Sequence, residues 1–139
     1  RNCCAALPSR DITRSPFLPL FFFSRFDLTT LQADTLVAWD AYLGSASYSP
    51  DGKQLLVTGS PSAFGGIGKN CGEHPIANDF DTQAFIMDLA TKKVQAITRD
   101  FNPTVSPVQW NRVDGCIYFD TTDGDCRHIL PLCSEDGRL

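Results

Sequence analysis

Two Asp-Gly pairs, each placed between two β-prone runs, constrain the fold of this 139-residue chain most strongly. The first pair lies in the Ser-Pro-Asp-Gly-Lys segment at 49–53, and the second follows Trp110 within residues 111–115. An Asp-Gly pair in this setting is a strong short-range signal for a β-hairpin. Repetition of the unit predicts an array of small antiparallel sheets, which differs from the core of a compact enzyme.

The composition favours a turn-rich β protein over a helical one. The chain has ten Phe, nine Pro and ten Gly but a single Met. Its length allows one domain with a substantial core, since chains of this size bury roughly two-thirds of their unfolded surface. The formal net charge is a mild -4 and no run of basic residues occurs, so we expect no nucleic-acid surface.

Short β-prone runs separated by turn signals predict strands from residue 35 onward. The glycine-rich stretch 59–81 interrupts them as a long loop insertion, and loops of this kind are often functional or mobile. Residues 1–34 show no clean period, and we expect them to be irregular, with at most one short strand near Leu20–Phe23. The predicted strands are 35–39, 46–48, 53–58, 82–89, 94–98, 105–110, 116–121 and 127–132.

The spacing of the repeat indicates a β-propeller. Asp51 and Asp114 are 63 positions apart. Removing about 20 residues for the insertion leaves roughly 43, which is the period of a four-stranded propeller blade. We therefore predict an all-β fold of antiparallel four-stranded blades, incomplete at about two blades. The expected units are the irregular segment 1–34, a first blade at 35–103 carrying the insertion, and a second blade at 104–139, truncated where its fourth strand should begin.

Two blades do not close a ring of four to eight. We therefore expect the remaining blades or the N-terminal segment to cover the exposed strand edges, with self-association through those edges as an alternative. The core candidates at period-two spacing are Leu55, Val57, Phe85, Met87, Leu89, Val108, Trp110, Ile117 and Phe119.

Three segments resemble the β-propeller of prolyl-oligopeptidase-family serine peptidases, of the dipeptidyl-peptidase kind in Bacteroides-like bacteria. They are residues 48–57, 83–93 and 108–111. The Ser-Pro-Asp-Gly-Lys hairpin also resembles the repeats of periplasmic TolB-like propellers. The peptidase resemblance implies a propeller that gates a separate α/β-hydrolase domain, in which Ser, Asp and His carry out catalysis. No segment here matches that domain, so the resemblance supplies no catalytic residue.

No segment of the chain satisfies a catalytic or cofactor motif, and we predict neither kind of site. At 44–48, alanine and tyrosine replace the nucleophile and the final glycine of a Gly-x-Ser-x-Gly elbow. The loop 65–70 resembles a phosphate-binding loop, but Ala63 and Asn70 replace its first glycine and its hydroxyl ligand. A blade insertion is the favoured interpretation of that loop.

We also predict no metal site. The acidic segment 120–125 does not follow the register of a calcium loop, and a solvated hairpin turn is favoured there. Four residues could supply zinc ligands, namely Cys116, Cys126, His128 and Cys133. No pair of them has the spacing of a zinc knuckle.

Six cysteines are more than a typical cytosolic domain carries but too few for a disulfide scaffold. Whether any of them form a disulfide stays open from the sequence. The apolar cluster 17–23 is far shorter than the about 20 residues that cross a bilayer, so we expect no membrane span. Pro16 precedes this cluster and Pro19 interrupts it, which favours packing or disorder over a secretory signal. The number of cysteines and the resemblance together indicate a periplasmic or secreted protein.

The sequence-based hypothesis is a non-catalytic propeller portion of an exported serine peptidase, which gates or scaffolds an absent α/β-hydrolase domain. The alternative is a TolB-like propeller module that presents its loops to a protein partner. A third hypothesis is a stand-alone β protein without activity, since a fold alone does not specify a function.

Overall fold

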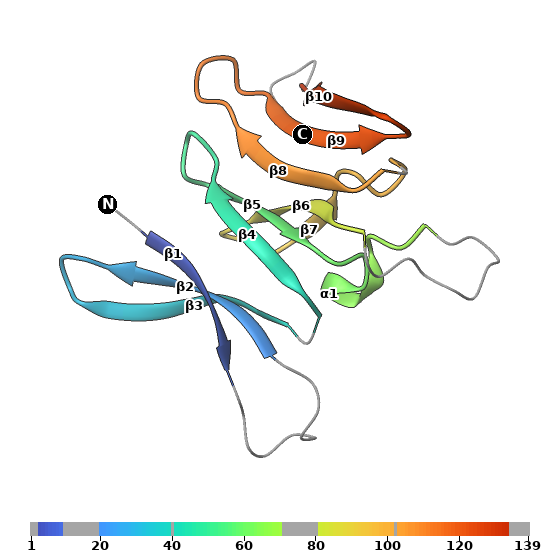
Figure 1. Ribbon diagram of the computed structural model, residues 1–139. Coiled ribbons are helices and arrows are strands. Elements are labelled where there is room, and N and C mark those ends of the chain that lie inside the picture. The colour runs from blue at the N-terminus through green and yellow to red at the C-terminus, as the bar shows by residue number, and fades with distance from the viewer. Residues whose placement is uncertain (1–2, 10–19, 40, 71–80, 102, 134–139) are drawn as a thin grey trace.

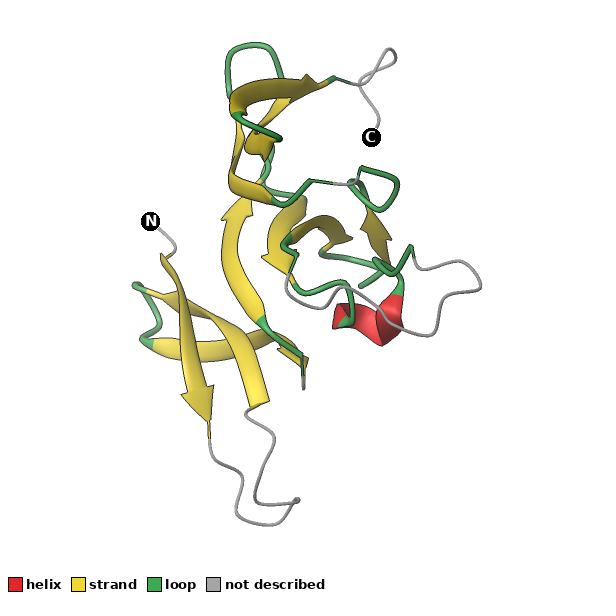
Figure 2. Cartoon of the chain, turned by 45° about the vertical axis from the view of Figure 1, so that its right-hand side comes forward, coloured by secondary structure: helices red, strands yellow, loops and turns green. Residues whose placement is uncertain are grey.

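A computed structural model describes residues 3–9, 20–39, 41–70, 81–101 and 103–133 as three antiparallel β-sheets (Figure 1). Each sheet is a meander, because strands that follow one another in sequence pair with one another. Strands dominate the described part of the chain, and a short helical turn lies beside them (Figure 2). The predicted all-β class with antiparallel hairpins is confirmed.

We name the sheets by their place in the chain. The N-terminal sheet contains β1 to β3, the central sheet β4 to β7, and the C-terminal sheet β8 to β10. The elements are β1 Cys3–Ser9, β2 Leu20–Asp27, β3 Gln32–Trp39, β4 Leu43–Tyr48, β5 Gln54–Gly59, α1 Ala63–Gly66, β6 Gln83–Asp88, β7 Val94–Ala96, β8 Val105–Trp110, β9 Ile117–Asp123 and β10 Cys126–Leu132.

Residues 1–34 are not the irregular segment that the sequence predicted. Where the structure describes them, they form β1, β2 and the start of β3. The predicted strand at 35–39 is the end of β3, which pairs with β2 and so belongs to the N-terminal sheet. The central sheet therefore begins at Leu43, and residues 35–39 are not part of it.

A β-bulge interrupts the alternation of β3 at Leu36. The register of β2 and β3 shifts at the bulge, where Phe23 pairs with Val37 and Ser24 pairs with Thr35. Leu36 is the extra residue, and both it and Val37 are buried. Two consecutive buried side chains break the alternation on which a strand is recognised in sequence.

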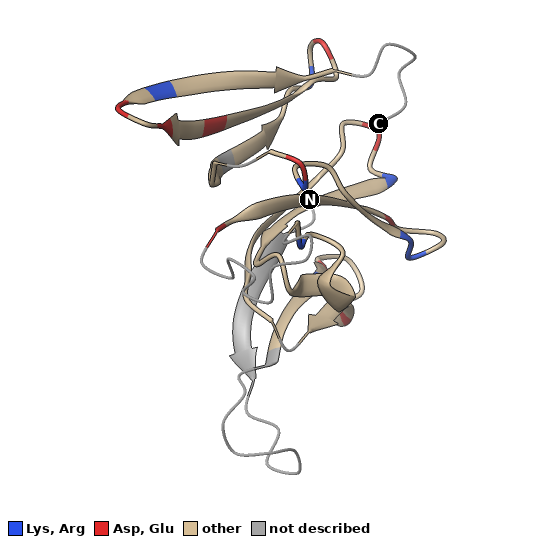
Figure 3. Cartoon of the chain, turned by 90° about the vertical axis from the view of Figure 1, so that its right-hand side faces the viewer, with Lys and Arg blue, Asp and Glu red and all other residues tan. Residues whose placement is uncertain are grey.

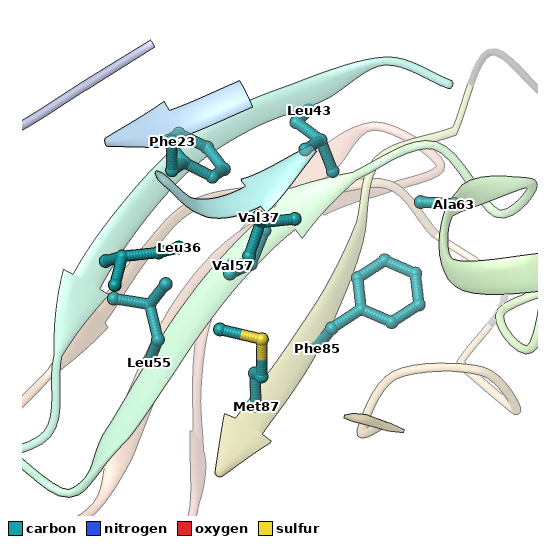
Figure 4. Packing of buried hydrophobic residues seen from close by; sticks show 9 residues of the cluster. All are labelled: Phe23, Leu36, Val37, Leu43, Leu55, Val57, Ala63, Phe85 and Met87. Carbon is teal, nitrogen blue, oxygen red and sulfur yellow. The ribbon is translucent and has the colours of Figure 1, made fainter. Parts of the chain in front are cut away.

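The central sheet is buried on both faces. Leu55 and Val57 of β5 pack in one core with Phe23 of the N-terminal sheet (Figure 4). Leu56, which lies between them in sequence, packs in a second core with Val105 of the C-terminal sheet. Successive side chains of a strand point to opposite faces, so the central sheet separates the two cores and the three sheets form three layers.

Strand β6 repeats this arrangement. Phe85 and Met87 join the core shared with the N-terminal sheet, whereas Ala84 and Ile86 join the core shared with the C-terminal sheet. Strands buried on both faces carry continuous apolar runs instead of alternation. Of the predicted core residues, the buried ones are Leu55, Val57, Phe85, Met87, Ile117 and Phe119, and the partly buried ones are Leu89, Val108 and Trp110.

Both Asp-Gly pairs form hairpin turns as predicted, but the two turns differ in backbone geometry. In the β4–β5 turn, the N–H of Gly52 donates to the carbonyl of Ser49 at 2.9 Å, with Pro50 at the second position. In the β8–β9 turn, the N–H of Gly115 reaches one residue further back and donates to the carbonyl of Asn111 at 3.1 Å. The second turn is therefore not a structural copy of the first.

The β8–β9 turn shares its geometry with the turns that join β2 to β3 and β6 to β7. In the β2–β3 turn, the N–H of Leu31 donates to the carbonyl of Asp27, four residues earlier, at 2.8 Å. In the β6–β7 turn, the N–H of Lys92 donates to the carbonyl of Asp88 at the same distance. The closing residue has a positive φ in all three turns: 57° at Leu31, 60° at Lys92 and 75° at Gly115. One turn type thus occurs in each of the three sheets.

Candidate functional site

An apolar groove with a volume of about 480 Å³ lies between the N-terminal and central sheets. Its walls come from β3, from α1 and the residues that follow it, from β6, and from the β6–β7 turn. Several of its residues belong to the core drawn in Figure 4. We call it the inter-sheet groove and define it by Leu36, Trp39, Phe64, Ile67, Met87 and Lys92.

Phe64 forms an aromatic wall of the inter-sheet groove. Its ring centroid lies 5.7 Å from that of Trp39 and 5.1 Å from that of Phe85. Ring pairs at such distances and tilts are favourable. Phe64 has a φ of 54°, in the left-handed region that non-glycine residues seldom adopt. An unfavourable backbone conformation therefore accompanies the placement of this ring between Trp39 and Phe85.

The glycine-rich loop at 65–70 packs onto β6 beside this groove. A Cβ atom at Gly68 would lie 2.9 Å from Cζ of Phe85 and 3.1 Å from Cα of Pro61, so only glycine allows this close approach. The carbonyl of Lys69 accepts a hydrogen bond from Arg99 Nε at 3.2 Å. These contacts give the loop a packing role in the insertion between β5 and β6.

Lys92 lies at the rim of the groove, at the end of the β6–β7 turn. Asp88 Oδ1 fixes this turn by accepting hydrogen bonds from the N–H groups of Thr91 at 2.7 Å and Ala90 at 3.1 Å, and from the Thr91 hydroxyl at 2.8 Å. The Thr91 N–H and then its hydroxyl are the main groups that hold the pKa of Asp88 below its usual value. Among the residues that the structure describes, no ion pair involves Lys92.

A second, more polar depression of about 480 Å³ lies on the β8–β9 hairpin, beside Trp110. The hydroxyl of Tyr118 and the side-chain amide of Asn111 both donate to Asp114 Oδ2 at 2.9 Å. A hydrogen bond from the Cys116 N–H lowers the pKa of Asp114, and the Asp114 carboxylate raises the pKa of Tyr118. These groups satisfy one another within the hairpin, which gives the network a structural role in the turn.

Cys116 and Cys133 form a disulfide, with their Cα atoms 4.5 Å apart. They flank the paired residues Ile117 and Leu132, so the disulfide joins β9 and β10 at one end of their hairpin. This answers the question that the sequence left open for these two cysteines and removes both as thiolate ligands of a metal. Cys126, at the turn end of the same hairpin, is free and exposed.

The acidic segment 120–125 lies at the β9–β10 turn, as the hairpin interpretation predicted. Arg127 donates from Nε to both carboxylate oxygens of Asp120, and this contact lowers the pKa of Asp120 and raises that of Arg127. Within the ranges that the structure describes, three or more metal-ligating side chains do not gather anywhere.

Charged residues lie mainly at turns and on strands of the N-terminal and C-terminal sheets, whereas the interior of the central sheet is uncharged (Figure 3). Arg25 pairs with Asp34 at 3.2 Å on the N-terminal sheet, where both side chains are exposed. The described part of the chain contains no helix with the length and apolar character needed to cross a membrane.

The sequence did not single out Trp39, Phe64 or Lys92 as site residues. One signal for the turn that carries Lys92 was present: Asp-Leu-Thr-Thr at 27–30 and Asp-Leu-Ala-Thr at 88–91 are near-identical segments. No such signal exists for the groove itself, because its walls come from segments far apart in sequence.

No protein-family model matches the chain, and no curated protein matches it significantly. The function is therefore inferred from the arrangement of the sheets and from the chemistry of the residues that they bring together.

Proposed function

We propose that this chain forms consecutive blades of a β-propeller and acts as a non-catalytic scaffold. One observation carries the proposal: the central sheet is a four-stranded antiparallel meander, and its two faces pack against two further antiparallel sheets. A blade inside a propeller has this environment, since it is a four-stranded sheet with a neighbouring blade on each side. The 63-position offset of the Asp-Gly hairpins, which includes the insertion at 59–81, agrees with one blade per repeat.

The shared turn supports a position within a blade for each strand of the N-terminal sheet. In the central sheet this turn follows the third strand at Asp88, and in the N-terminal sheet it follows β2 at Asp27. Strands β2 and β3 then correspond to the third and fourth strands of a blade, and β1 to the second. The same turn also joins β8 to β9, so in the C-terminal sheet the turn does not fix the strand positions. There the assignment rests on chain order: β8 and β9 follow the central sheet and would begin the next blade. The chain would thus hold one whole blade between portions of two others.

We further propose that this propeller belongs to a serine peptidase and gates an α/β-hydrolase domain outside these residues. The resemblance to prolyl-oligopeptidase-family propellers supports this proposal. Its segments at 48–57, 83–93 and 108–111 fall on the β4–β5 hairpin, on the β6–β7 hairpin and at the end of β8. These are hairpin segments of the kind that repeat from blade to blade.

A periplasmic or secreted location is part of the same proposal. The disulfide between Cys116 and Cys133 supports it, because disulfides persist in oxidising compartments and are rare in the cytosol.

A TolB-like module for protein binding is the second candidate. Strand β10 favours it, because it lies at the edge of the C-terminal sheet and an edge strand can pair with a strand of another chain. In this case the edge of the C-terminal sheet would bind another protein.

Activity measurements on the 139-residue chain test the scaffold role. We expect neither hydrolysis of Gly-Pro-p-nitroanilide and Ala-Ala-p-nitroanilide nor labelling by a fluorophosphonate probe, because the sequence has no Gly-x-Ser-x-Gly elbow. Turnover that a serine-reactive inhibitor abolishes would overturn the proposal. The coding sequence downstream of Leu139 separates the two candidates. A Gly-x-Ser-x-Gly motif followed by Asp and His supports the peptidase, whereas further hairpin repeats and then a stop codon support the binding module.

A further inference from the structure

The inter-sheet groove has the size and lining of a small-molecule site. Its volume of about 480 Å³ falls in the range of roughly 300–1,000 Å³ that is typical of pockets for small ligands. Leu36 and Met87 are buried at its base, and the rings of Trp39 and Phe64 form one wall. A ligand in this groove would therefore contact mainly aliphatic and aromatic carbon.

The rim of the groove adds one positive charge. Lys92 is the charged residue among those that line it, and it forms no ion pair with the described residues. The nearest carboxylate in sequence, Asp88, is engaged by the turn amides and by Thr91. An ammonium group beside an apolar cavity is complementary to an anionic group on an apolar molecule.

One unfavourable backbone conformation lies in the wall of the groove. Three non-glycine residues have a positive φ in the described chain, namely Leu31, Phe64 and Lys92. At Leu31 and Lys92 the positive φ belongs to the shared turn, whose closing residue has it in all three sheets. Phe64 lies outside that turn and lines the groove. A left-handed conformation costs a non-glycine residue about 1–2 kcal/mol, and such conformations cluster at ligand sites.

We propose that the inter-sheet groove binds one small monocarboxylate with an apolar body. The body packs against the wall formed by Trp39 and Phe64 and against Met87, and the carboxylate accepts a hydrogen bond from Lys92 Nζ. A small molecule fits better than a protein partner, because the groove is small and a stable protein interface needs about 800 Å² of surface on each side. The site requires the packing of the N-terminal sheet on the central sheet, and it does not depend on the proposed scaffold role.

An NMR titration of the ¹⁵N-labelled chain with 4-phenylbutyrate tests this proposal, with 4-phenylbutan-1-ol as the uncharged probe of the same shape. The two tryptophans provide an internal control, since Trp39 lines the groove and Trp110 lies on the C-terminal sheet. We expect saturable shifts at the indole N–H of Trp39 and none at that of Trp110. The carboxylate should bind about tenfold more tightly than the alcohol, which corresponds to one charge-assisted hydrogen bond.

Variants of the groove separate the charge from the apolar wall. Lys92→Gln should remove the tenfold preference for the carboxylate and leave the affinity for the alcohol unchanged, and Lys92→Arg should restore the preference. The neighbouring Lys93→Gln is the matched control and should bind both probes as the native chain does. Ile67→Asn, at an exposed rim position, should weaken both probes equally. The proposal is overturned if 4-phenylbutyrate gives no saturable shift at Trp39, or if Lys92→Gln and Lys93→Gln reduce the preference to the same extent.

Discussion

Asp27 and Asp88 hold the same turn in two different sheets. Oδ1 of Asp27 accepts hydrogen bonds from the N–H groups of Thr29 at 2.8 Å and Thr30 at 3.1 Å, and Oδ1 of Asp88 accepts from the two corresponding amides of its own turn. Each aspartate carbonyl also accepts the N–H that closes the turn. The repeated geometry relates the end of the N-terminal sheet to the end of the central sheet.

Acidification should weaken these turns. Hydrogen bonds from backbone N–H groups, chiefly those of Thr29 and Thr91, lower the pKa of Asp27 and of Asp88 in the folded state below the usual 3.8. A carboxyl group whose pKa is lower in the folded than in the unfolded state stabilises the fold at pH values above its unfolded pKa. This stabilisation is lost as the pH falls through the pKa of the folded state. We therefore expect part of the free energy of unfolding to be lost below about pH 4, measured by urea denaturation at pH 6 and pH 2.5.

The Asp27→Asn, Asp88→Asn double variant tests this origin of the acid sensitivity. Asparagine keeps an acceptor oxygen at this position. In the β8–β9 turn, Asn111 Oδ1 accepts a hydrogen bond from the N–H of Val113 in this way. The variant should fold at pH 6 and show a smaller loss between pH 6 and pH 2.5. Asp100→Asn, an exposed position outside these turns, should leave the loss unchanged. An equal acid loss in the native chain and the double variant would contradict the account.

Glycine should stabilise the turn at Leu31. This residue has a φ of 57° and is 71% exposed, so its side chain adds little packing. Glycine adopts the left-handed conformation without steric cost, but it loses more chain entropy on folding than leucine does. We expect the difference to raise the free energy of unfolding of Leu31→Gly by about 0.5–1 kcal/mol. Thermal or chemical denaturation measures this change.

Two variants of the β8–β9 turn serve as controls for Leu31→Gly. Gly115→Ala should lower stability by about 1 kcal/mol for backbone reasons alone, since a Cβ there meets no atom within 4 Å. Val113→Gly, at a position that is 94% exposed, should also lower stability, by about 0.5–1 kcal/mol. Stabilisation by Val113→Gly as large as that by Leu31→Gly would show that the φ at Leu31 is not the cause.

The disulfide should stabilise the β9–β10 hairpin. Cys116 and Cys133 are 17 residues apart, and a loop of this length corresponds to about 3 kcal/mol in the chain-entropy account. The Cys116→Ala, Cys133→Ala variant should lose stability of this order in urea denaturation, whereas Cys126→Ala should lose little.

Peptide mapping under non-reducing conditions checks which cysteines pair. Cys116 and Cys126 fall in one tryptic peptide, because cleavage follows Arg112 and Arg127. The Cys126→Ala variant is therefore used, and it should still give the linked peptide pair that contains Cys116 and Cys133. Loss of that pair would show that Cys126 is the true partner of Cys133.

The sequence was sufficient where turn chemistry dominates. The Ser-Pro-Asp-Gly turn predicted the β4–β5 hairpin, and period-two apolar residues such as Phe85 and Met87 predicted β6 and its buried face. Both signals are local, because proline and glycine fix backbone angles and alternation fixes which side chains share a face.

The sequence was insufficient where tertiary contacts decide. In the N-terminal sheet the sequence predicted the end of β3 at 35–39 and at most a short part of β2, and it missed β1. Residues 1–34 show no alternation, and their strands are defined by pairing with one another. The inter-sheet groove was also missed, because Trp39, Phe64 and Lys92 lie on three separate segments that meet only after two sheets pack. Phe64 further adopts a φ that its residue type disfavours, and no local propensity predicts such a conformation.

The central sheet is covered on both faces, and adjacent substitutions in β5 test this arrangement. Leu55 faces the N-terminal sheet and Leu56 faces the C-terminal sheet, and both are buried. Truncation of a buried leucine to alanine costs about 2–5 kcal/mol. We predict losses in this range for Leu55→Ala and for Leu56→Ala, measured separately by urea denaturation. A large loss for Leu55→Ala with less than about 0.5 kcal/mol for Leu56→Ala, the range of a surface position, would contradict the three-layer arrangement.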